Sequence, residues 1–450
     1  MGNARTALFN ALMGHKRGAR FVLRIEDTDT ERSRDEFVAA LKEDLLWLGL
    51  DWQEGPDVGG EQGPYFQSQR TPIYAQYYQQ LLEAGLAYPC FCSPTELEVM
   101  RKAQAQAGLP PRYDGRCSRL MPEQAQQKMA EGIPYTLRFK VPKGETVVFE
   151  DGIKGRQRFN TDDIGDFIIR KADGSAAFFF SNAIDDALMG ITHVIRGEDH
   201  LTNTPRQILL LQALGLPVPQ YAHMSMIVGA DGSPLSKRHG SRSIRQLRAE
   251  GFLPQALTNY MARLGHTYKD ADNRLMDLQA LAEGFELSQC GTAPARYDEN
   301  QLLFWQKEAV QALSDAAAAE WLAPFVQDKV PAEKWLPFAA LMRDNITLPA
   351  EAVAWAERLF TPMPLPDVAL PVAVSGDFFV AGERALAEGA DFSGLVEALK
   401  ATGAKGKTLF QPLRWVLTGQ LQGPELPVLF ELMGRAEAHR RFAQAREVQA

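Results

Sequence analysis

Near residue 242 the hydrophobic pattern of the chain changes from a mixture of strand and helix patterns to a helical pattern. Before this point short apolar runs alternate with helical spacing: a predicted strand at 191–196 is followed by a polar turn and a helix that begins at Thr204. After it, helical spacing continues to the end, interrupted by the Pro-rich stretch 361–371. Because 450 residues exceed the roughly 250–300 that one hydrophobic core supports, we expect an α/β half and an all-α half.

A second change of pattern lies inside the α/β half. A β-prone run at 20–25 and helices at about 33–48 and 71–84 form part of a βαβ repeat. Further on, the sequence pattern is different. It contains two close cysteines, a Gln- and Ala-rich helix and short strands such as 135–141. We therefore predict an inserted domain at 88–174.

Composition and charge exclude several classes of protein. With 45% hydrophobic and 23% charged residues, the chain is not predominantly disordered, collagen-like or coiled coil. No stretch approaches the roughly 18 apolar residues of a membrane helix, and four cysteines without a signal-peptide core predict a cytoplasmic location. The 48 basic and 56 acidic residues argue against indiscriminate coating of nucleic acid. Local basic surfaces remain possible at 237–248 and 435–446, where solvated helix faces are the alternative.

The segment 229–240, Gly-Ala-Asp-Gly-Ser-Pro-Leu-Ser-Lys-Arg-His-Gly, follows a predicted strand at 223–228. Its glycines let the backbone approach a phosphate, while Ser236, Lys237 and Arg238 offer a hydroxyl and two cations. Such groups suit an anion whose charge grows during a reaction, as when pyrophosphate leaves ATP. A surface turn is the alternative, but ligands of open α/β sheets bind at the carboxyl ends of strands.

The chain begins with a helical pattern. Asn3 is expected to cap a helix whose apolar positions Ala4, Leu8 and Leu12 keep helical spacing. A Gly loop that enters a helix normally follows a strand in α/β folds, and no such strand precedes this helix.

Together these segments resemble class I aminoacyl-tRNA synthetases, and among them the bacterial-type glutamyl-tRNA synthetases. Pro-Leu-Ser-Lys-Arg at 234–238 is similar to the family's second ATP motif, KMSKS, with Pro234 in place of the first lysine. Gly-Asn-Ala-Arg-Thr-Ala-Leu-Phe-Asn at 2–10 resembles the continuation of the other ATP motif, HIGH. Arg-Ile-Glu-Asp-Thr-Asp at 24–29 and the run 193–200, which ends in Gly-Glu-Asp-His, extend the resemblance.

The resemblance implies that the first histidine of HIGH and the strand before it are missing. We expect that the reading frame begins upstream of Met1; the alternative is a truncated, catalytically impaired tRNA-binding paralogue. A further alternative is the shorter relative of the glutamyl-queuosine-tRNA type, which attaches glutamate to a modified tRNA base and lacks an anticodon-binding domain.

The resemblance also implies a glutamate site. Glu26 would hold the α-ammonium group, and a carboxylate at a strand end suits that pairing. Arg196 would bind a substrate carboxylate bidentately, and Asn182 would hydrogen-bond the glutamate side chain. Phe178 stands where many members of the family have tyrosine.

Each of these residues also has an interpretation without the resemblance. The acids that begin at Glu26 fit a capping cluster before the helix that begins near Ser33. The aromatic run 178–180 fits a hydrophobic core, and Asp185 and Asp186 fit acids at a helix start.

For ATP, which would enter with Mg²⁺, the resemblance implies two groups of residues. Lys237 is the expected stabiliser of the leaving pyrophosphate, acting with Arg238 and Ser236. The nucleotide itself would contact Gly2, Asn3, Arg5, Glu198 and Lys237.

Three cysteines lie close together in the predicted insertion, where some members of the family hold structural zinc. They are Cys90, Cys92 and Cys117. The family's final histidine corresponds to Arg119, so Tyr113 would be the fourth ligand, as in a shorter related enzyme. Structural zinc sites usually have four protein ligands, and ordinary reduced cysteines are the alternative.

The helical half resembles the family's anticodon-binding region at 403–419. Lys405, Lys407 and Arg414 are the expected phosphate contacts there. The resemblance implies a Rossmann-like catalytic domain in two parts, an inserted acceptor-binding domain, a helical stem-contact domain and an all-helical anticodon-binding domain. Their expected ranges are 1–87 with 175–241, 88–174, 242–310 and 311–450.

The implied function is ATP-dependent ligation of L-glutamate to tRNA(Glu). The reaction would pass through glutamyl-adenylate and release AMP and pyrophosphate. We expect a monomer with no membrane partner, and the sequence leaves open whether tRNA(Gln) is also charged.

Overall fold

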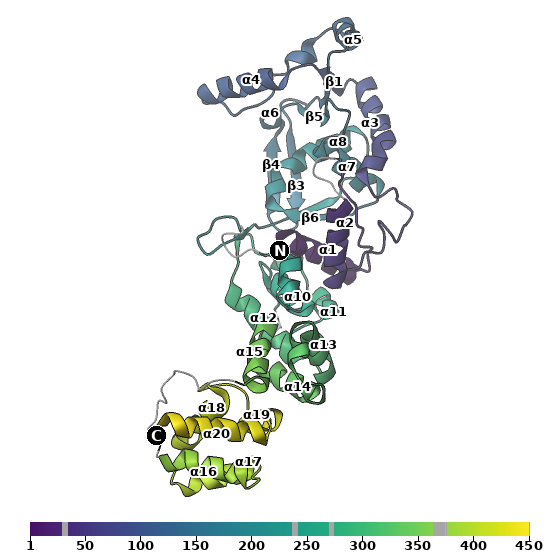
Figure 1. Cartoon of the computed structure of the whole chain (residues 1–450). Coiled ribbons are helices and arrows are strands. Elements are labelled where there is room, and N and C mark those ends of the chain that lie inside the picture. Colours follow the sequence, from purple (N-terminus) through teal and green to yellow (C-terminus); the bar gives the residue numbers. More distant parts are fainter. Residues whose placement is uncertain (29–34, 236–241, 270–273, 363–373, 375, 450) are drawn as a thin grey trace. The chain divides into compact units, whose positions relative to one another are not determined.

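A computed structural model describes residues 1–28, 35–235, 242–269, 274–362, 374 and 376–449 of the chain (Figure 1). The backbone divides into two compact units. The first contains residues 1–244 and 258–298, and the second contains 245–257 and 299–450. No helix among the described residues is long and apolar enough to cross a membrane.

Two sheets form the framework of the first unit. Their strands are β1 (Ala87–Cys90), β2 (Thr136–Phe139), β3 (Thr146–Asp151), β4 (Gly155–Asn160), β5 (Phe167–Arg170), β6 (His193–Gly197) and β7 (Gln220–Met224). One sheet is antiparallel, in the order β1-β2-β5. The other has the order β4-β3-β7-β6; β7 is parallel to both β3 and β6, and β4 is antiparallel to β3.

The first unit also contains helices. They are α1 (Gly2–Arg17), α2 (Asp35–Trp47), α3 (Thr71–Glu83), α4 (Pro94–Gln106), α5 (Pro122–Ala130), α6 (Thr161–Ile164), α7 (Phe178–Leu188), α8 (Thr204–Ala213) and α11 (Leu278–Glu283). A hydrophobic core joins α3, α7 and α8 to both sheets, and within it the rings of Tyr78 and Phe180 stack with centroids 4.4 Å apart. The helix predicted at 71–84 and the strand predicted at 191–196 are confirmed as α3 and β6.

The predicted cap of the first helix is wrong. α1 begins at Gly2, with Met1 at the N-cap position, so Asn3 lies inside the helix. The Met1 carbonyl already accepts a hydrogen bond from Arg5 N at 3.0 Å, and helical bonding therefore starts before Asn3. The helix ends at Gly18, whose φ of 61° gives the left-handed conformation common at helix ends.

The run 20–25 is extended, but it does not form the regular strand that the sequence predicts. Val22 and Ile25 form single parallel bridges with Glu54 and Phe66. Leu23 N donates to Glu54 O at 2.9 Å, and Ile25 N donates to Tyr65 O at 2.8 Å. Because these partners come from separate irregular segments, no continuous ladder forms.

The single strand predicted at 223–228 is two strands. β7 ends at Met224, and β8 (Ile227–Val228) pairs in parallel with β9 (Ala295–Arg296) in a separate sheet. Between them, Met226 N donates to Glu198 Oε1 at 2.9 Å, so a side chain replaces the ladder partner. β9 also corrects the expectation that no strand occurs beyond residue 242.

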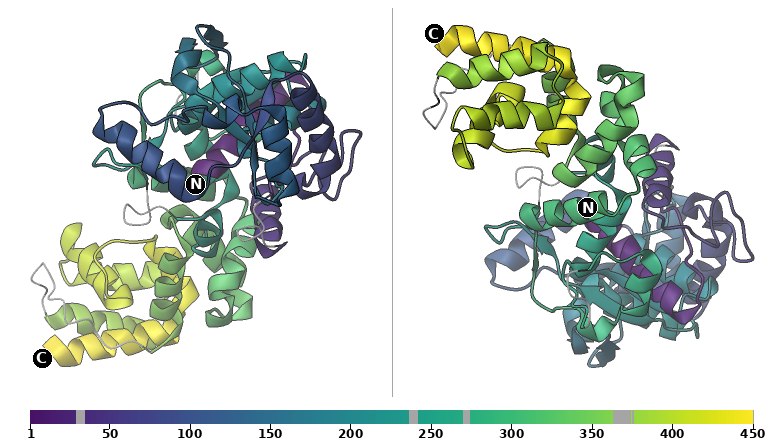
Figure 2. Two further views of the ribbon diagram at one scale, coloured as in Figure 1. Left: turned by 90° about the horizontal axis from the view of Figure 1, so that it is seen from above. Right: turned by 90° about the horizontal axis from the view of Figure 1, so that it is seen from below.

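In its described residues the second unit contains helices and no strand, as the pattern predicts. The helices are α12 (Glu299–Gln311), α13 (Asp315–Val326), α14 (Trp335–Asn345), α15 (Pro349–Phe360), α16 (Gly376–Ala387), α17 (Phe392–Ala401), α18 (Lys407–Thr418), α19 (Leu426–Met433) and α20 (Arg435–Gln449). One hydrophobic core runs from α13 to α20. Helices α16 to α20, green to yellow, lie together in both views of Figure 2. The chain passes between the units within α9 (Ile244–Ala249), within α10 (Pro254–Arg263) and again before α12, between residues 298 and 299.

Candidate active site

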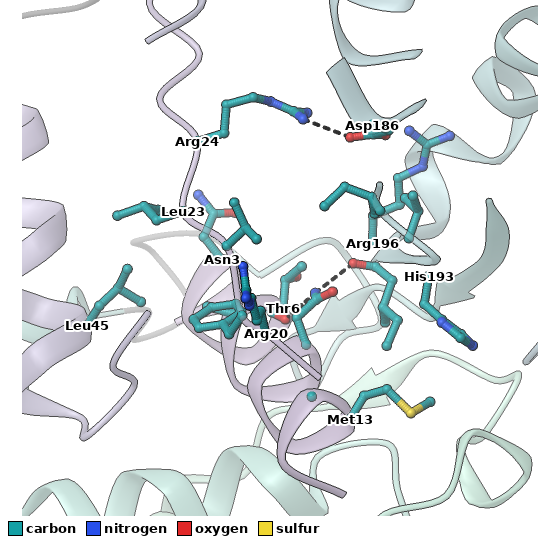
Figure 3. Close-up of a pocket in the computed structure, with 18 of the residues that line it drawn as sticks. Asn3, Thr6, Met13, Arg20, Leu23, Arg24, Leu45, Asp186, His193 and Arg196 are labelled. Atoms are coloured by element: carbon teal, nitrogen blue, oxygen red, sulfur yellow. Dashed lines mark hydrogen bonds and ion pairs between the residues drawn. The ribbon is translucent and has the colours of Figure 1, made fainter. Parts of the chain in front are cut away.

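A cavity of about 1120 Å³ lies inside the first unit, bordered by α1, the extended segment 19–24, β6 and residues of α7 (Figure 3). Ligand pockets typically measure roughly 300–1,000 Å³, so the cavity has room for more than one small molecule. Five of the residues predicted to contact ATP or glutamate line it. They are Asn3, Glu26, Phe178, Asn182 and Arg196. The fold thus brings side chains from four distant segments to one space.

Arg24 is a central charge of this cavity, and the sequence analysis assigned it no role. Its Nη1 lies 2.9 Å from Asp186 Oδ1, the ion pair drawn in Figure 3. Its Nη2 lies 3.6 Å from Glu26 Oε1 and 3.4 Å from Asn182 Oδ1. Arg24 therefore links the extended segment before Glu26 to helix α7.

Glu26 faces the cavity with 43% of its side chain exposed. The surrounding protein removes bulk water, which raises the pKa of the carboxyl, and the charge of Arg24 opposes that rise. Asp186 also raises it by repulsion. A carboxylate that is poorly solvated and only partly compensated can pair with an incoming cation.

The interpretation of Asp185 and Asp186 as acids at a helix start is wrong. Helix α7 begins at Phe178, so both aspartates lie in its second half, and both are buried. Asp185 accepts hydrogen bonds from three buried side chains and is completely inaccessible to solvent. The donors are Arg70 Nε at 2.6 Å, Tyr74 OH at 2.7 Å and Gln67 Nε2 at 2.9 Å.

Arg196 lies in β6, at the carboxyl end of a strand, as predicted. Its Nε donates to His223 Nε2 at 3.2 Å, and its Nη2 donates to Thr204 Oγ1 at 2.8 Å and Gln207 Oε1 at 2.7 Å. Three of the five guanidinium N–H groups are thus engaged within the protein. Among the described residues no hydrogen bond engages Nη1, so the bidentate contact we expected would come from the two N–H groups of that nitrogen.

A buried Asp–His pair supports Arg196 from behind. His223 Nδ1 lies 2.5 Å from Asp151 Oδ2, and neither side chain is accessible to solvent. Because Arg196 Nε can only donate, His223 Nε2 accepts and Nδ1 carries the proton toward Asp151. Burial alone would raise the pKa of Asp151, but hydrogen bonds from His223 and from the Ile153 and Lys154 amides lower it. The sequence analysis identified neither residue.

Phe178 begins helix α7 and is 37% exposed. Its ring stacks on His200, with centroids 5.3 Å apart and planes inclined by 30°. Both rings line the cavity, and they give it an aromatic side close to the polar groups.

The residues expected beside ATP are placed in different ways. Gly2 and Asn3 are exposed at the start of α1, and Asn3 lines the cavity. Arg5 is 4% exposed, and it donates to the backbone carbonyls of Leu264 at 3.0 Å and Ser225 at 2.5 Å. Burial lowers its pKa to about 10. Glu198 forms an ion pair with Lys154 and accepts a hydrogen bond from the Met226 backbone amide. Arg5 and Glu198 are therefore both engaged by other groups of the protein.

The predicted catalytic cations lie outside the described residues, as does Ser236. The described residues before these positions end at Leu235, in a turn that follows β8, and resume at residue 242. In this turn Gly229 N donates to Ser233 O at 2.8 Å, and Leu235 N donates to Ile227 O at 3.0 Å.

The four residues predicted to bind zinc lie close together. The sulfur atoms of Cys90, Cys92 and Cys117 lie within 4.8 Å of one another. Tyr113 OH lies 3.3 Å from Cys90 Sγ and 3.5 Å from Cys92 Sγ. Hydrogen bonding to Cys117 lowers the pKa of Cys90 to about 4, which favours a thiolate. The three sulfur atoms are donors that structural zinc sites use, and the phenol oxygen of Tyr113 is the fourth polar atom beside them.

The expected phosphate contacts of the helical half differ from one another. Lys405 and Lys407 are exposed beside the start of α18. Arg414 is half-buried, and its Nη1 donates to Pro424 O at 2.7 Å. The arginines of 435–446 are also engaged inside the second unit, where Arg441 is 2% exposed and Arg446 pairs with Glu383 at 2.7 Å.

Comparison with known proteins places this site in a family. A family model described as "tRNA synthetases class I (E and Q), catalytic domain" matches residues 1–304. The chain belongs to this family. A second model, "Anticodon binding domain", matches residues 386–446. The Rossmann-like α/β catalytic fold and the helical anticodon-binding part expected from the resemblance are thus confirmed.

Relatives of the family cover almost the entire chain. A protein of Nitrosococcus oceani called "Glutamate--tRNA ligase 2" is 55% identical over 98% of this chain and 94% of its own length. A protein of Alkalilimnicola ehrlichii with the same name is 53% identical over 100% of this chain and 95% of its own length. A glutamate tRNA ligase from Elizabethkingia meningosepticum, crystallised in complex with its amino acid, superposes with a TM-score of 0.90. The two sequences are 30% identical, and the superposition covers 100% of this chain and 97% of the crystallised chain.

Proposed function

We propose that the chain ligates L-glutamate to tRNA(Glu), using ATP. The convergence of Glu26, Asn182 and Arg196 on one cavity carries the proposal, because these groups complement the two charged ends of glutamate. The names of the relatives, glutamate–tRNA ligases at 53–55% identity, support the same substrate.

The reaction has two steps. The α-carboxylate of glutamate attacks the α-phosphorus of Mg²⁺-bound ATP, which forms glutamyl-adenylate and releases pyrophosphate. The terminal ribose hydroxyl of tRNA then attacks the activated carbonyl, which forms the ester and releases AMP. The protein contributes positioning and charge stabilisation, without a covalent intermediate.

Within the cavity Glu26 receives the α-ammonium group, and Arg196 receives the side-chain carboxylate together with Asn182. Phe178 and His200 flank the bound molecules with their rings.

Gly2 and Asn3 contact the nucleotide. Arg5 and Glu198 act on it indirectly, because both already bond inside the protein. Ser236, Lys237 and Arg238 neutralise the departing pyrophosphate.

The tRNA contacts follow the division of the chain. In our proposal 1–87 with 175–241 is catalytic, 88–174 binds the acceptor end, and 242–310 contacts the stem. The helical part at 311–450 binds the anticodon through Lys405 and Lys407, with Arg414 placing α18 through its bond to Pro424. The proposal includes a cytoplasmic monomer. A charging assay with separated glutamate and glutamine tRNAs decides whether tRNA(Gln) is a second acceptor.

Zinc fits the cluster of Cys90, Cys92, Tyr113 and Cys117. Bound there, it would crosslink β1 to the segment around residue 117 and stiffen the acceptor-binding insertion. The cluster belongs to the structure of the insertion and takes no part in ligation.

Adenylate formation tests the proposed function. Pyrophosphate exchange, measured with glutamate and tRNA present, should fall by roughly 100-fold or more in Lys237→Ala, while tRNA affinity stays nearly unchanged. Lys329→Ala is the matched control, because Lys329 lies in the second unit and pairs only with Glu357 at 3.3 Å among the described contacts. A chain that binds tRNA but exchanges no pyrophosphate would instead be the catalytically impaired paralogue.

A further inference from the structure

The oxygen of the Asn182 side chain is fully occupied on the protein side. Gln67 Nε2 donates to Asn182 Oδ1 at 3.0 Å, and Arg24 Nη2 approaches the same atom at 3.4 Å. A guanidinium nitrogen can only donate, so the atom that faces Arg24 must be the oxygen of the amide. The orientation of Asn182 is therefore determined by its neighbours, independently of how the amide is drawn.

Gln67 is oriented in turn by Asp185. Gln67 Nε2 lies 2.9 Å from Asp185 Oδ2, and a carboxylate can only accept. Arg70 and Tyr74 donate to the same carboxylate, and all four side chains are buried. The chain of hydrogen bonds thus runs from Asp185 through Gln67 to the oxygen of Asn182.

This arrangement leaves the Asn182 nitrogen directed toward the cavity. Asn182 lines the cavity, and within the described part of the chain its Nδ2 has no hydrogen-bond partner. Arg196 Nη1 also has no hydrogen-bond partner among the described residues, whereas the other two nitrogens of that guanidinium are engaged. Asp186, an acid that also lines the cavity, is paired with Arg24 at 2.9 Å.

The two groups argued to be available here, Asn182 Nδ2 and Arg196 Nη1, are both N–H donors, and such a pair distinguishes a carboxylate from a carboxamide. Both oxygens of a carboxylate accept hydrogen bonds, whereas the NH₂ group of a carboxamide would face donors with its own donors. Sites that are built to hydrogen-bond one group discriminate strongly against an analogue that leaves buried partners unpaired.

We propose that Gln67 and Asp185 are positioning residues that set the amino-acid specificity of the cavity, by holding Asn182 with its nitrogen toward the substrate side chain. The proposal rests on the proposed function, since it takes glutamate as the ligand, and it adds residues that do not touch that ligand. If Gln67 no longer donates, the Asn182 oxygen keeps only the longer 3.4 Å approach of Arg24 Nη2. The amide is then held less firmly and can rotate to present its oxygen, which accepts from a glutamine side chain.

Binding of glutamate and glutamine to the full chain, measured by titration calorimetry, tests this. Gln67→Met keeps the volume of the side chain and removes the donor. We expect the ratio of the dissociation constants, glutamine over glutamate, to fall by about tenfold, the worth of one hydrogen bond in a charged site. The dissociation constant for ATP should stay within about twofold of wild type.

Gln79→Met is the matched control. Gln79 lies on α3, is exposed, and donates to Glu83 at 2.8 Å, away from the cavity. It receives the same substitution and should keep the wild-type ratio. A second variant, Gln67→Asn, retains a polar amide but is one methylene too short to bridge Asp185 and Asn182, and it should also lower the ratio.

The outcomes separate the two proposals. A wild-type chain that binds glutamate in preference to glutamine, with an unchanged ratio in both Gln67 variants, overturns the positioning role and leaves the proposed function intact. A wild-type chain that binds neither amino acid overturns both. A lowered thermal stability of Gln67→Met without a change of ratio identifies a purely structural role, and Gln67→Asn supplies the ratio if Gln67→Met does not fold.

Discussion

The two units of this protein bury different kinds of side chain. In the first unit, charged and polar groups are almost inaccessible and bonded in pairs, as Asp185 is with Arg70 and His223 is with Asp151. In the described residues of the second unit, the buried polar side chains are Gln306, Thr418 and Arg441, and its core is otherwise hydrophobic.

This difference shows how each unit meets its task. A buried charge is expensive unless it is paired, so a network of them stabilises a unit little and makes it sensitive to the loss of any partner. In return it holds side chains in single orientations, as Asp185 holds Gln67. The second unit presents its candidate tRNA contacts, Lys405 and Lys407, on its surface, where no such network is needed.

The largest expected effect is on stability. Arg70→Met removes the cation that lies 2.6 Å from the buried carboxylate of Asp185, which should lower the free energy of unfolding of the first unit by about 3–5 kcal/mol. Arg441→Met is the matching change in the second unit. There Glu437 keeps Arg440 as a partner and is 22% exposed, so the loss should be about 1–3 kcal/mol.

Hydrogen exchange, read separately for amides of α7 and of α20, measures the two losses. Each variant should lower protection in its own unit. Equal losses from the two substitutions would contradict the comparison, because they would show that the buried network of the first unit is no more sensitive than a partly solvated ion pair.

A smaller effect should follow from His266, a buried residue of the first unit. It is 4% exposed, its Nε2 accepts from Glu286 N at 3.1 Å, and burial lowers its pKa to about 4. The unfolded chain takes up this proton near pH 6.5 and the folded chain only near 4. The stability that depends on a neutral His266 is therefore fully present above pH 6.5. It is lost as the pH falls toward 4, which lowers the free energy of unfolding by up to about 3 kcal/mol.

His266→Gln isolates this contribution, because a glutamine oxygen can accept from Glu286 N but does not titrate. Denaturant unfolding of the first unit between pH 7 and 4.5 should show a steeper loss of stability in the wild type than in the variant. Parallel curves would mean that His266 is protonated in the folded protein or does not titrate on unfolding.

The smallest expected effect concerns tRNA affinity at the surface of the second unit. Lys405→Ala and Lys407→Ala should each weaken tRNA binding by about 1 kcal/mol or less and lower the slope of log affinity against log salt by about 0.7–1. Arg414→Met should change that slope less and the stability of the second unit more, because its guanidinium bonds Pro424. A salt titration of binding distinguishes these cases, and a slope that only Arg414→Met changes would reverse our assignment.

Much of the local structure could be predicted from the sequence. The helix at 71–84, the strand at 191–196 and the helical second half follow from periodicity over neighbouring residues. The strand at 223–228 could not be divided correctly, since its break depends on Glu198, a residue of another segment. The same holds for the run 20–25, whose partners lie in separate loops.

The cavity shows the same limit. Motifs identified Glu26, Asn182 and Arg196, because each stands in a recognisable stretch. They did not identify Arg24 as the link between these residues, although it stands in one of the quoted motifs. The partners of Arg24 lie about 160 residues further along the chain.

The sequence by itself determined which segments are helical, which are extended, and which residue types are available to bind an amino acid and a nucleotide. Only the tertiary structure decided which atoms of these residues face the cavity and which are used inside the protein. The physical reason is range: backbone preferences act between neighbours, whereas burial and hydrogen bonding join residues such as Gln67 and Asn182 that only folding brings together.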